Sequence, residues 1–545
     1  MSIFSKTKVN KPKTSTFNMS YDRKFSLNMG NLTPIHVQEI VPGDYIKMNS
    51  QQMLRFMPMV APVMHEVNVF THFFFVPNRI MWPNWEKFIT GGREGYDEPL
   101  LPCLNIGNMG SNFNSVTPSS LADYLGLPLT DASLGQEVGE TVSALPFMAY
   151  QMIYNEYYRD QNLIPDIFEA HQSDGMLQDG LQTEEFIADA LWPLRKRAWQ
   201  HDYFTSALPW AQRGEAVRIP VFNDEGGPIS TYFDPTGRSV VRDLDGSPYT
   251  DGSHQLGNFA TTGALNLDTH TSGGTNDTPV NLDNASNIKI DPAAANPNLA
   301  TVTDLRRAFK LQEWLEKIAR TGARYTEVLK AFFGVTSSDA RLQRPEFLGG
   351  SMSPVMISEV LQTSETTNTG TPLADMAGHG LNVGSGQGFA KFFEEHGYLI
   401  GIMSVMPKTA YQQGVPRHFS KFDKYDYFWP EFQHIGEQAI LNKELMLVGD
   451  VDRNNATFGY TPRYAEYKYN PSTVHGYFKS SLDFWHLGRI FSPQEPPTLS
   501  ADFIECNPRN NIFAVEDTEE DHLVAHVFHN IYATRRMSYF GEPKF

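Results

Sequence analysis

Three histidines near the end of the chain, His522, His526 and His529, have the type and spacing that best fit a metal site. On a helix, spacings of four and three would place the three imidazoles on one face, with Glu519 nearby. The segment from 523 to 534, however, alternates apolar residues with a period of two and contains several β-branched residues, which favours a strand. On a strand, His522 and His526 share one face and His529 points to the other. We therefore predict no metal site here.

The segment GSGQG at 384–388 has the glycine content of a phosphate-binding loop. Such a loop needs a preceding strand and a following helix whose N–H groups point at the anion, and the third glycine comes one residue early for the dinucleotide pattern. A flexible hinge or a tight turn is the favoured interpretation. The chain contains no GxSxG motif, and its two cysteines, Cys103 and Cys506, are predicted to be reduced and buried. No catalytic residue, metal or cofactor is predicted.

The first 24 residues carry the main signal for nucleic-acid binding, because they hold six basic residues and one acidic residue in a chain of net charge −18. Lys6, Lys8, Lys11 and Lys13 are spaced so that they can meet phosphates without a fold, and each neutralised phosphate releases counterions. Residues 1–20 are predicted to form this arm. A solubilising tail that binds nothing remains an alternative.

The elements that position these residues are mainly strands. A strand at 63–76 has Val63, Val67, Val69, Phe73 and Phe75 on one face, so that one face is predicted to be buried. The run at 398–406 is apolar on both faces, which is typical of a strand inside a sandwich, and it is half the length of a membrane span. Helices are predicted at 145–163, 184–199, 301–322 and 326–333.

Residues 223–300 differ from the rest of the chain. They contain no Lys or Arg between Arg242 and Lys289 and are rich in Gly, Asn, Thr, Ser and Asp. Such a stretch cannot form a deep core alone, and it is too long for an ordinary connection. It is therefore predicted to be a surface insertion loop. Strands of ~6 residues each use few residues of so long a chain, so most residues must lie outside the sandwich.

Long colinear stretches resemble the major capsid protein of gokushoviruses, a group of the Microviridae. The stretches that carry the resemblance include FFFVPNRIMWPNWEKFI (73–89), RKRAWQHDYFTSALPWAQRG (195–214), DLRRAFKLQEWLEKIARTGARYTEVLKAFFGVTSSDARLQRPEFLGG (304–350) and FEEHGYLIGIMSVMPKTAYQQGVPRHFSKFDKYDYFWPEF (393–432).

The resemblance implies a mainly β fold, an eight-stranded antiparallel jelly roll over 21–545 with long, partly helical insertions. It also implies pentamers and a T=1 icosahedral shell of sixty copies around circular single-stranded DNA, found in the virion and assembled in the cytoplasm of a bacterial host. The arm lysines would then face the genome. Residues 223–300 would form a protrusion at the threefold axes that meets a host receptor, for which the candidates are Asp251, Asn258, Thr262, Asn266 and Asn276.

Sixty arms of net charge +5 supply about 300 positive charges, whereas the DNA encoding only these 545 residues carries about 1,600 phosphates. Other cations are therefore needed, and the family implies a small basic DNA-binding protein in the virion. A carbohydrate-binding or carbohydrate-cleaving β-sandwich is the alternative, and it predicts a cleft with facing carboxylates. A packaging protein that binds DNA alone is disfavoured by the acidic remainder of the chain.

Overall fold

The computed structural model describes residues 14–540 with some gaps. The gaps are 107–114, 131–139, 168–189 apart from 174, 216–230 apart from 217, most of 234–301 between short strands, 323, 364–375, 387 and 516–519. The chain divides into two compact units, one formed by Met1–Arg213 with Glu316–Phe545 and the other by Gly214–Leu315. Each unit is described by itself.

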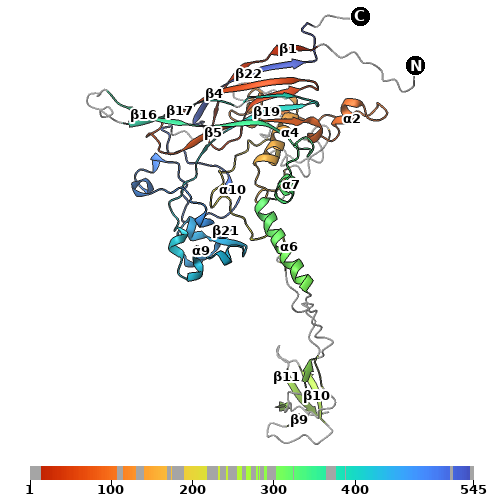
Figure 1. Cartoon of the computed structure of the whole chain (residues 1–545), viewed down its shortest axis with the longest axis vertical. Coiled ribbons are helices and arrows are strands. Elements are labelled where there is room, and N and C mark those ends of the chain that lie inside the picture. Colours follow the sequence, from red (N-terminus) through yellow and green to blue (C-terminus); the bar gives the residue numbers. More distant parts are fainter. Residues whose placement is uncertain are drawn as a thin grey trace. The chain divides into compact units, whose positions relative to one another are not determined.

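The first unit is built on two antiparallel sheets (Figure 1). The β4 sheet has the order β2 (Tyr21–Leu27), β22 (Leu523–Arg535), β4 (Tyr45–Phe56) and β17 (Met376–Ser385). The β5 sheet has the order β3 (Thr33–Ile40), β19 (Gly397–Pro407), β5 (Val67–Pro77) and β15 (Glu346–Pro354). Short strands extend the β4 sheet: β1 (Ser15–Asn18), β16 (Met356–Leu361) and β18 (Phe389–Phe392).

The chain alternates between the two sheets in the order that defines a jelly roll. It passes from β2 to β3, β4 and β5, adds β15 beside β5, and returns through β17, β19 and β22. Each of these eight strands pairs antiparallel with its neighbours. The predicted eight-stranded jelly roll is therefore confirmed.

The sandwich core lies between the sheets. Along β4 every second residue is buried, so Ile46, Met48 and Leu54 point inward while their neighbours point out. They pack against inward residues of the β5 sheet such as Phe73 and Met403. This strict alternation is what a strand with one buried face requires.

The β5 sheet is instead buried on both faces, which corrects one sequence prediction. The predicted strand at 63–76 begins only at Val67, and every residue of β5 except His72 is buried. Phe74 and Val76, on the face predicted to be polar, pack against α4 (Leu145–Ile153). Glu66, Asn68 and His72 occupy alternate positions and predict an exposed opposite face. The large apolar residues between and after them instead need a cover, which the sequence does not identify. The prediction that 398–406 is buried on both faces is confirmed by β19.

Two insertions hold most of the helices. The first, residues 78–345, contains α1 (Asn78–Met81), α2 (Trp85–Thr90), β6 (Cys103–Ile106), α3 (Leu121–Leu125), β7 (Glu140–Ser143), α4, a π-helical turn (Tyr154–Tyr158), α6 (Val302–Thr321) and α7 (Tyr325–Phe333). The second, residues 408–522, contains β20 (Glu437–Leu441), α8 (Asn442–Leu445), α9 (Val451–Asn455), β21 (Thr457–Pro462) and α10 (Ala501–Ile504). It also has six 3-10 turns, at Arg417–Ser420, Lys424–Asp426, Pro430–Phe432, Ala465–Tyr467, Gly476–Lys479 and Asp483–Trp485.

The predicted helices at 301–322 and 326–333 are confirmed by α6 and α7. Gly322 has a φ of +95°, a conformation that suits glycine at a helix end, and its N–H donates to the Ile318 carbonyl at 3.0 Å. The prediction at 145–163 is confirmed for α4 and the π-helical turn. Of the predicted helix at 184–199, residues 184–189 lie outside the described residues and 190–191 are π-helical. The prediction is wrong for 192–199, because Lys196 and Ala198 form isolated β-bridges to Asn31 and Glu505. Pairing with distant backbone replaces the local helical bonds there.

The second unit carries short antiparallel strands. Three form one sheet, β10 (His254–Phe259), β11 (Asn266–Thr271) and β12 (Thr278–Pro279). Two further pairs join β9 (Val241–Arg242) with β13 (Asn281–Leu282) and β8 (Thr231–Phe233) with β14 (Ile288–Ile290). The described part of the chain contains no helix long and apolar enough to cross a membrane.

Candidate functional site

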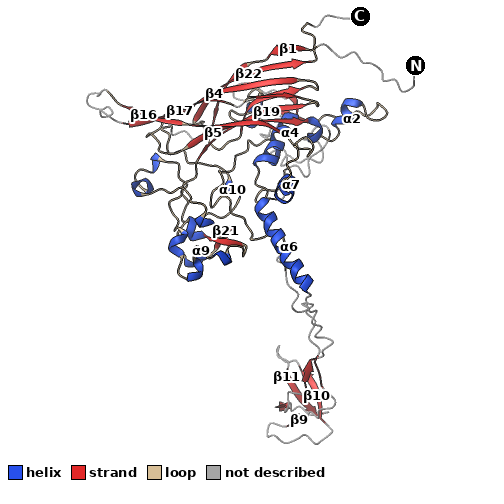
Figure 2. Ribbon diagram, viewed as in Figure 1, coloured by secondary structure: helices blue, strands red, loops and turns tan. Residues whose placement is uncertain are grey.

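The outward face of the β4 sheet is a large uncovered surface. Figure 2 shows that helices α4 and α10 lie on the side of β5 and β19, so that β4 and β22 form the outermost layer of the first unit. The side chains that point outward come from alternate positions of β4 and β22. They are Tyr45, Lys47, Asn49, Gln51, Met53 and Arg55 on β4, and Val524, His526, Phe528, Asn530, Tyr532 and Thr534 on β22.

The charge of this sheet is opposite to that of the whole chain. The exposed basic residues on the outward face are Lys24, Lys47 and Arg55, and the acidic residue beside them is Asp22. Arg23, Lys391 and Arg535 alternate to the opposite face, where Lys391 pairs with Glu346 and Arg535 pairs with Asp44. Asp22 accepts a hydrogen bond from Lys24 and lies 3.2 Å from Nε2 of His526. The bond from Lys24 holds the pKa of Asp22 below its ordinary value. With three basic residues and one carboxylate, the outward face has an excess of positive charge, and Asp22 is paired with Lys24.

A second surface, which we call the aromatic bay, lies in the second insertion. The bay is a cavity of about 880 Å³ whose lining includes Tyr203, Tyr411, Phe419 and Tyr467. Nine large aromatic side chains of this region are exposed: Phe419, Phe422, Tyr425, Tyr427, Phe428, Trp429, Tyr467, Tyr469 and Tyr477. Exposed apolar patches of this kind mark surfaces that contact partners.

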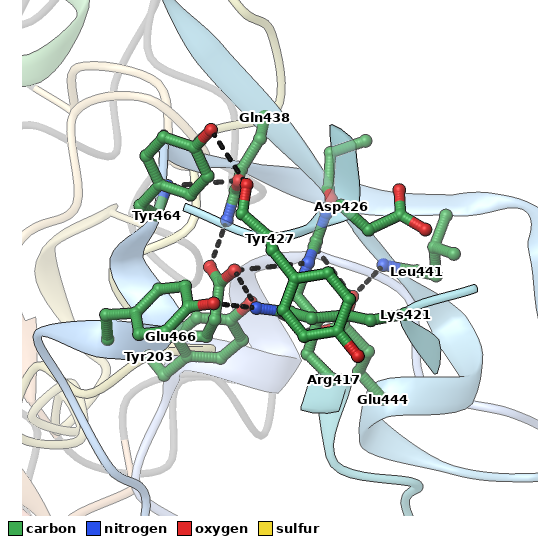
Figure 3. Close-up of polar contacts among 12 residues, drawn as sticks. Tyr203, Arg417, Lys421, Asp426, Tyr427, Gln438, Leu441, Glu444, Tyr464 and Glu466 are labelled. Carbon is green, nitrogen blue, oxygen red and sulfur yellow. Dashed lines mark hydrogen bonds and ion pairs between the residues drawn. The ribbon is translucent and has the colours of Figure 1, made fainter. Parts of the chain in front are cut away.

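A buried ion-pair network holds the wall of the bay in place (Figure 3). Glu444 accepts hydrogen bonds at 3.0 Å from Nη1 of Arg417, the hydroxyl of Tyr203 and the backbone N–H of Leu441. Burial raises the pKa of Glu444, although the nearby Arg417 guanidinium opposes that effect. The Arg417 pair anchors the start of the aromatic segment to β20 and α8.

Glu466 completes this network from the other side. It accepts a bond from Gln438 at 2.7 Å and lies 3.2 Å from Nζ of Lys421. Burial raises the pKa of Glu466, but the bonds from Gln438 and Lys421 outweigh it, so the pKa lies below its ordinary value. Lys421 also lies 4.0 Å from the ring centre of Tyr467, a cation–π contact. A glycan-cleaving site requires two carboxyl groups free to act as acid and base, whereas Glu444 and Glu466 are both engaged with cations.

The predicted DNA-binding lysines, Lys6, Lys8, Lys11 and Lys13, lie outside the described residues. The first described strand, β1, pairs Ser15 with Arg535 and Asn18 with Tyr532 at the edge of the β4 sheet. The arm is therefore joined to the sheet with the positive outward face.

Of the predicted attachment residues, Asn258 and Asn266 lie on neighbouring strands. Asn258 pairs with Leu267, and Asn266 pairs with Phe259. Asp251, Thr262 and Asn276 lie outside the described residues. The attachment role of all five stays a prediction.

The three C-terminal histidines do not gather at one place. His529 is buried in the sandwich, where Nδ1 lies 2.8 Å from Ser50 Oγ and Nε2 lies 3.0 Å from the Ile35 carbonyl. His526 is on the outward face, as the strand prediction requires. His522 precedes the strand and is buried against Phe513, so it does not share the face of His526 as predicted. Within the described residues no cluster of His, Cys, Asp or Glu can hold a metal, and Glu519 lies outside them.

The glycine segment at 384–388 is neither a phosphate loop nor a tight turn. Strand β17 ends with Ser385 opposite Gln51, and β18 begins with Phe389 opposite Met48, so both pair with β4 in the same direction. Between these two pairings the register with β4 shifts by one residue, as at a β-bulge, and Gln387 itself lies outside the described residues. No helix follows, and the small residues permit close approach to β4. Neither cysteine forms a disulfide, as predicted. Cys506 is buried, whereas Cys103 is half-buried, so the prediction that Cys103 is buried was wrong.

Two features were missed from the sequence. The density of aromatic residues in FSKFDKYDYFW (419–429) was a usable signal for the aromatic bay, because exposed Tyr, Phe and Trp are enriched at interfaces. The positive face of the β4 sheet had no such signal, since its residues come from β2, β4, β18 and β22, which are spread over the whole chain.

The order of the eight strands, the long insertions and the uncovered sheet together define a jelly roll of the viral capsid class. The comparisons agree: the family described as Capsid protein (F protein) matches residues 5–545, and the chain belongs to it. The chain is 37% identical over 544 residues to "Capsid protein VP1" of Bdellovibrio phage phiMH2K, which covers 97% of this chain and 95% of the relative. It is 34% identical to the protein of the same name from Chlamydia phage 1, with the same shares covered.

A third capsid protein VP1, from Spiroplasma virus 4, is 30% identical over 93% of this chain and 90% of the relative. These relatives confirm the resemblance to gokushovirus capsid proteins. The protein is thus a structural component of the phage virion and not an enzyme.

Proposed function

We propose that the protein is the major capsid protein of its virion, and that sixty copies assemble through pentamers into a T=1 shell around circular single-stranded DNA. The observation that carries the proposal is the jelly roll with an exposed aromatic surface in its second insertion. A shell subunit must present apolar surface to its neighbours, and in a shell of identical chains the partner is another copy. Assembly takes place in the cytoplasm of the bacterial host.

The assembly test uses the full-length chain, purified and examined by native mass spectrometry and electron microscopy. Sixty chains of 61.5 kDa predict a closed particle of about 3.7 MDa. A chain that stays monomeric at high concentration, in every salt tried, would contradict shell assembly. Particles of another mass would contradict the T=1 geometry alone.

The basic arm supports an inward role for the N-terminus. Lys6, Lys8, Lys11 and Lys13 add positive charge next to a sheet that is itself positive. Because the arms supply too few charges for the genome, a small basic virion protein is part of the proposal. Deleting residues 1–13 should give shells that assemble but release DNA at lower salt, and unchanged DNA retention across a salt series would argue against the arm.

The second unit supports an outward role, because residues 214–315 form a compact unit distinct from the jelly roll. In this proposal, residues 223–300 attach the virion to a host receptor. The proposed contact residues are Asp251, Asn258, Thr262, Asn266 and Asn276. Replacing 243–288 by a short Gly/Ser linker should leave assembly intact and abolish adsorption to host cells. If shells fail to form instead, the segment is structural.

A further inference from the structure

We propose that the outward face of the β4 sheet is a binding surface for single-stranded DNA, which holds phosphates with its cations and stacks bases on its aromatic rings. The inference rests on the proposed single-stranded genome and adds a second, folded contact to the arm. It concerns side chains from β2, β4, β18 and β22, which lie far apart in the sequence and meet only on the sheet.

The first argument is charge. Lys24, Lys47 and Arg55 are exposed on this face, against a single carboxylate, that of Asp22. The full chain has 62 acidic residues and a net charge of −18. A local excess of cations on an acidic protein is the electrostatic pattern of a phosphate-binding surface.

The second argument is the placement of the aromatic rings. On the strand register, Tyr45 lies opposite Phe392, and Tyr532 lies opposite Lys47. Directly opposite residues have Cβ atoms ~5 Å apart and diagonal ones ~7 Å, so Tyr45, Lys47 and Tyr532 are mutual neighbours. A cation between two exposed rings can hold a phosphate while bases stack on either side.

The third argument is the polar filling between the rings. Asn49 pairs with Asn530, and Gln51 pairs with Phe528. Amide side chains both donate and accept hydrogen bonds, so they can bond to the edges of any base. The surface therefore predicts binding with little preference for sequence.

The competing occupant is a second copy of this chain. The aromatic bay is better suited to that role, because its exposed rings surround a cavity, whereas the sheet face alternates cations, amides and single rings. Continuity also favours DNA. Strand β1, which follows the basic arm, pairs with β22 beside Tyr532, so DNA held by the arm would reach this face first.

The first test is ultraviolet crosslinking of purified DNA-containing particles, followed by mass spectrometry of the adducts. We expect nucleotide adducts on peptides that contain Tyr45, Phe392, Phe528 or Tyr532. Particles that hold single-stranded DNA but form adducts only elsewhere would overturn this inference and leave the proposed function intact. Particles whose packaged DNA proves to be double-stranded would instead contradict the proposed function.

The second test measures the affinity of the full-length chain for oligodeoxythymidine in a salt series. Y532T should weaken binding about tenfold with little change in salt dependence, because a stacking ring is lost. K47T should lower the slope of log K against log [salt] by about 0.7, because one phosphate contact is lost. The control is K87S/Y96S, which removes an exposed lysine and an exposed tyrosine from the first insertion.

The variants and the control should all retain the thermal unfolding midpoint of the wild type, since each substitution is on an exposed position. Binding by Y532T and K47T that equals binding by the control would overturn the proposal. Equal affinity of the wild type for double-stranded and single-stranded DNA would overturn the stacking contribution, because paired bases offer no free faces.

Discussion

Two histidines buried in the sandwich predict that the folded subunit loses stability in mild acid. His36 and His529 are 1% and 0% exposed, and their ring centres lie 5.1 Å apart. Burial, with the neighbouring His529 and Arg23, lowers the pKa of His36 to about 3. Burial likewise lowers the pKa of His529 to about 4. The hydrogen bond to the Ile35 carbonyl opposes this shift, and the charge of Arg23 adds to it.

The sign and magnitude follow from proton linkage. At pH 5 both imidazoles stay neutral in the folded chain, whereas in the unfolded chain an ordinary histidine pKa of about 6.5 makes them mostly protonated. The unfolded state then binds more protons, so stability falls as the pH drops below 6.5 and continues to fall towards the folded pKa values. Between pH 6.5 and pH 5, a span of about 1.5 pH units, each histidine lowers the free energy of unfolding by about 2 kcal/mol, so the pair lowers it by about 4 kcal/mol.

The assay is chemical denaturation of dissociated subunits at pH 7.5 and pH 5, followed by tryptophan fluorescence. H529Q should be less stable at pH 7.5, because it changes the partners of Ser50 Oγ and the Ile35 carbonyl. It should nevertheless lose about 2 kcal/mol less than the wild type on acidification. H526Q, on the same strand but on the outward face, keeps both buried imidazoles and serves as the control. The same acid-induced loss in H529Q and wild type would refute the argument.

Two further substitutions test the packing described above. E444Q leaves Arg417 without the buried carboxylate of Glu444 and should lower the free energy of unfolding by about 3 kcal/mol. Chemical denaturation measures this loss against E431Q, a control at an exposed position. Equal stability of the two variants would mean that the network does not hold the bay. F74A should lower the free energy of unfolding by about 3–5 kcal/mol, because Phe74 is buried between the β5 sheet and α4. F528A, on the outward face, should lower it by less than about 1 kcal/mol. Similar losses would contradict the assignment of the β5 sheet as covered and the β4 sheet as uncovered.

Strands with simple patterns were predictable, and features made by tertiary contact were not. The alternation of β22 and the two-sided apolar run of β19 predicted both strands, because burial alone determines those patterns. The second covered face of β5 depends on α4, which lies about seventy residues later and has no sequence link to the strand. The hinge or tight turn predicted at 384–388 was wrong for the same reason. A run of glycines permits a turn, but β17 before the segment and β18 after it both pair with β4, so the chain continues in one direction.

The unequal burial of the two sheets gives the subunit a polarity. The β5 sheet is covered on its outer face by the insertions, so their helices and aromatic surface lie on that side of the sandwich. The outward face of the β4 sheet is left to solvent and carries Lys24, Lys47 and Arg55 in a largely acidic chain, beside the strand that follows the basic arm. In a closed shell one of these sides must face the genome. We propose that it is the β4 side, because the exposed cations of that face attract phosphates.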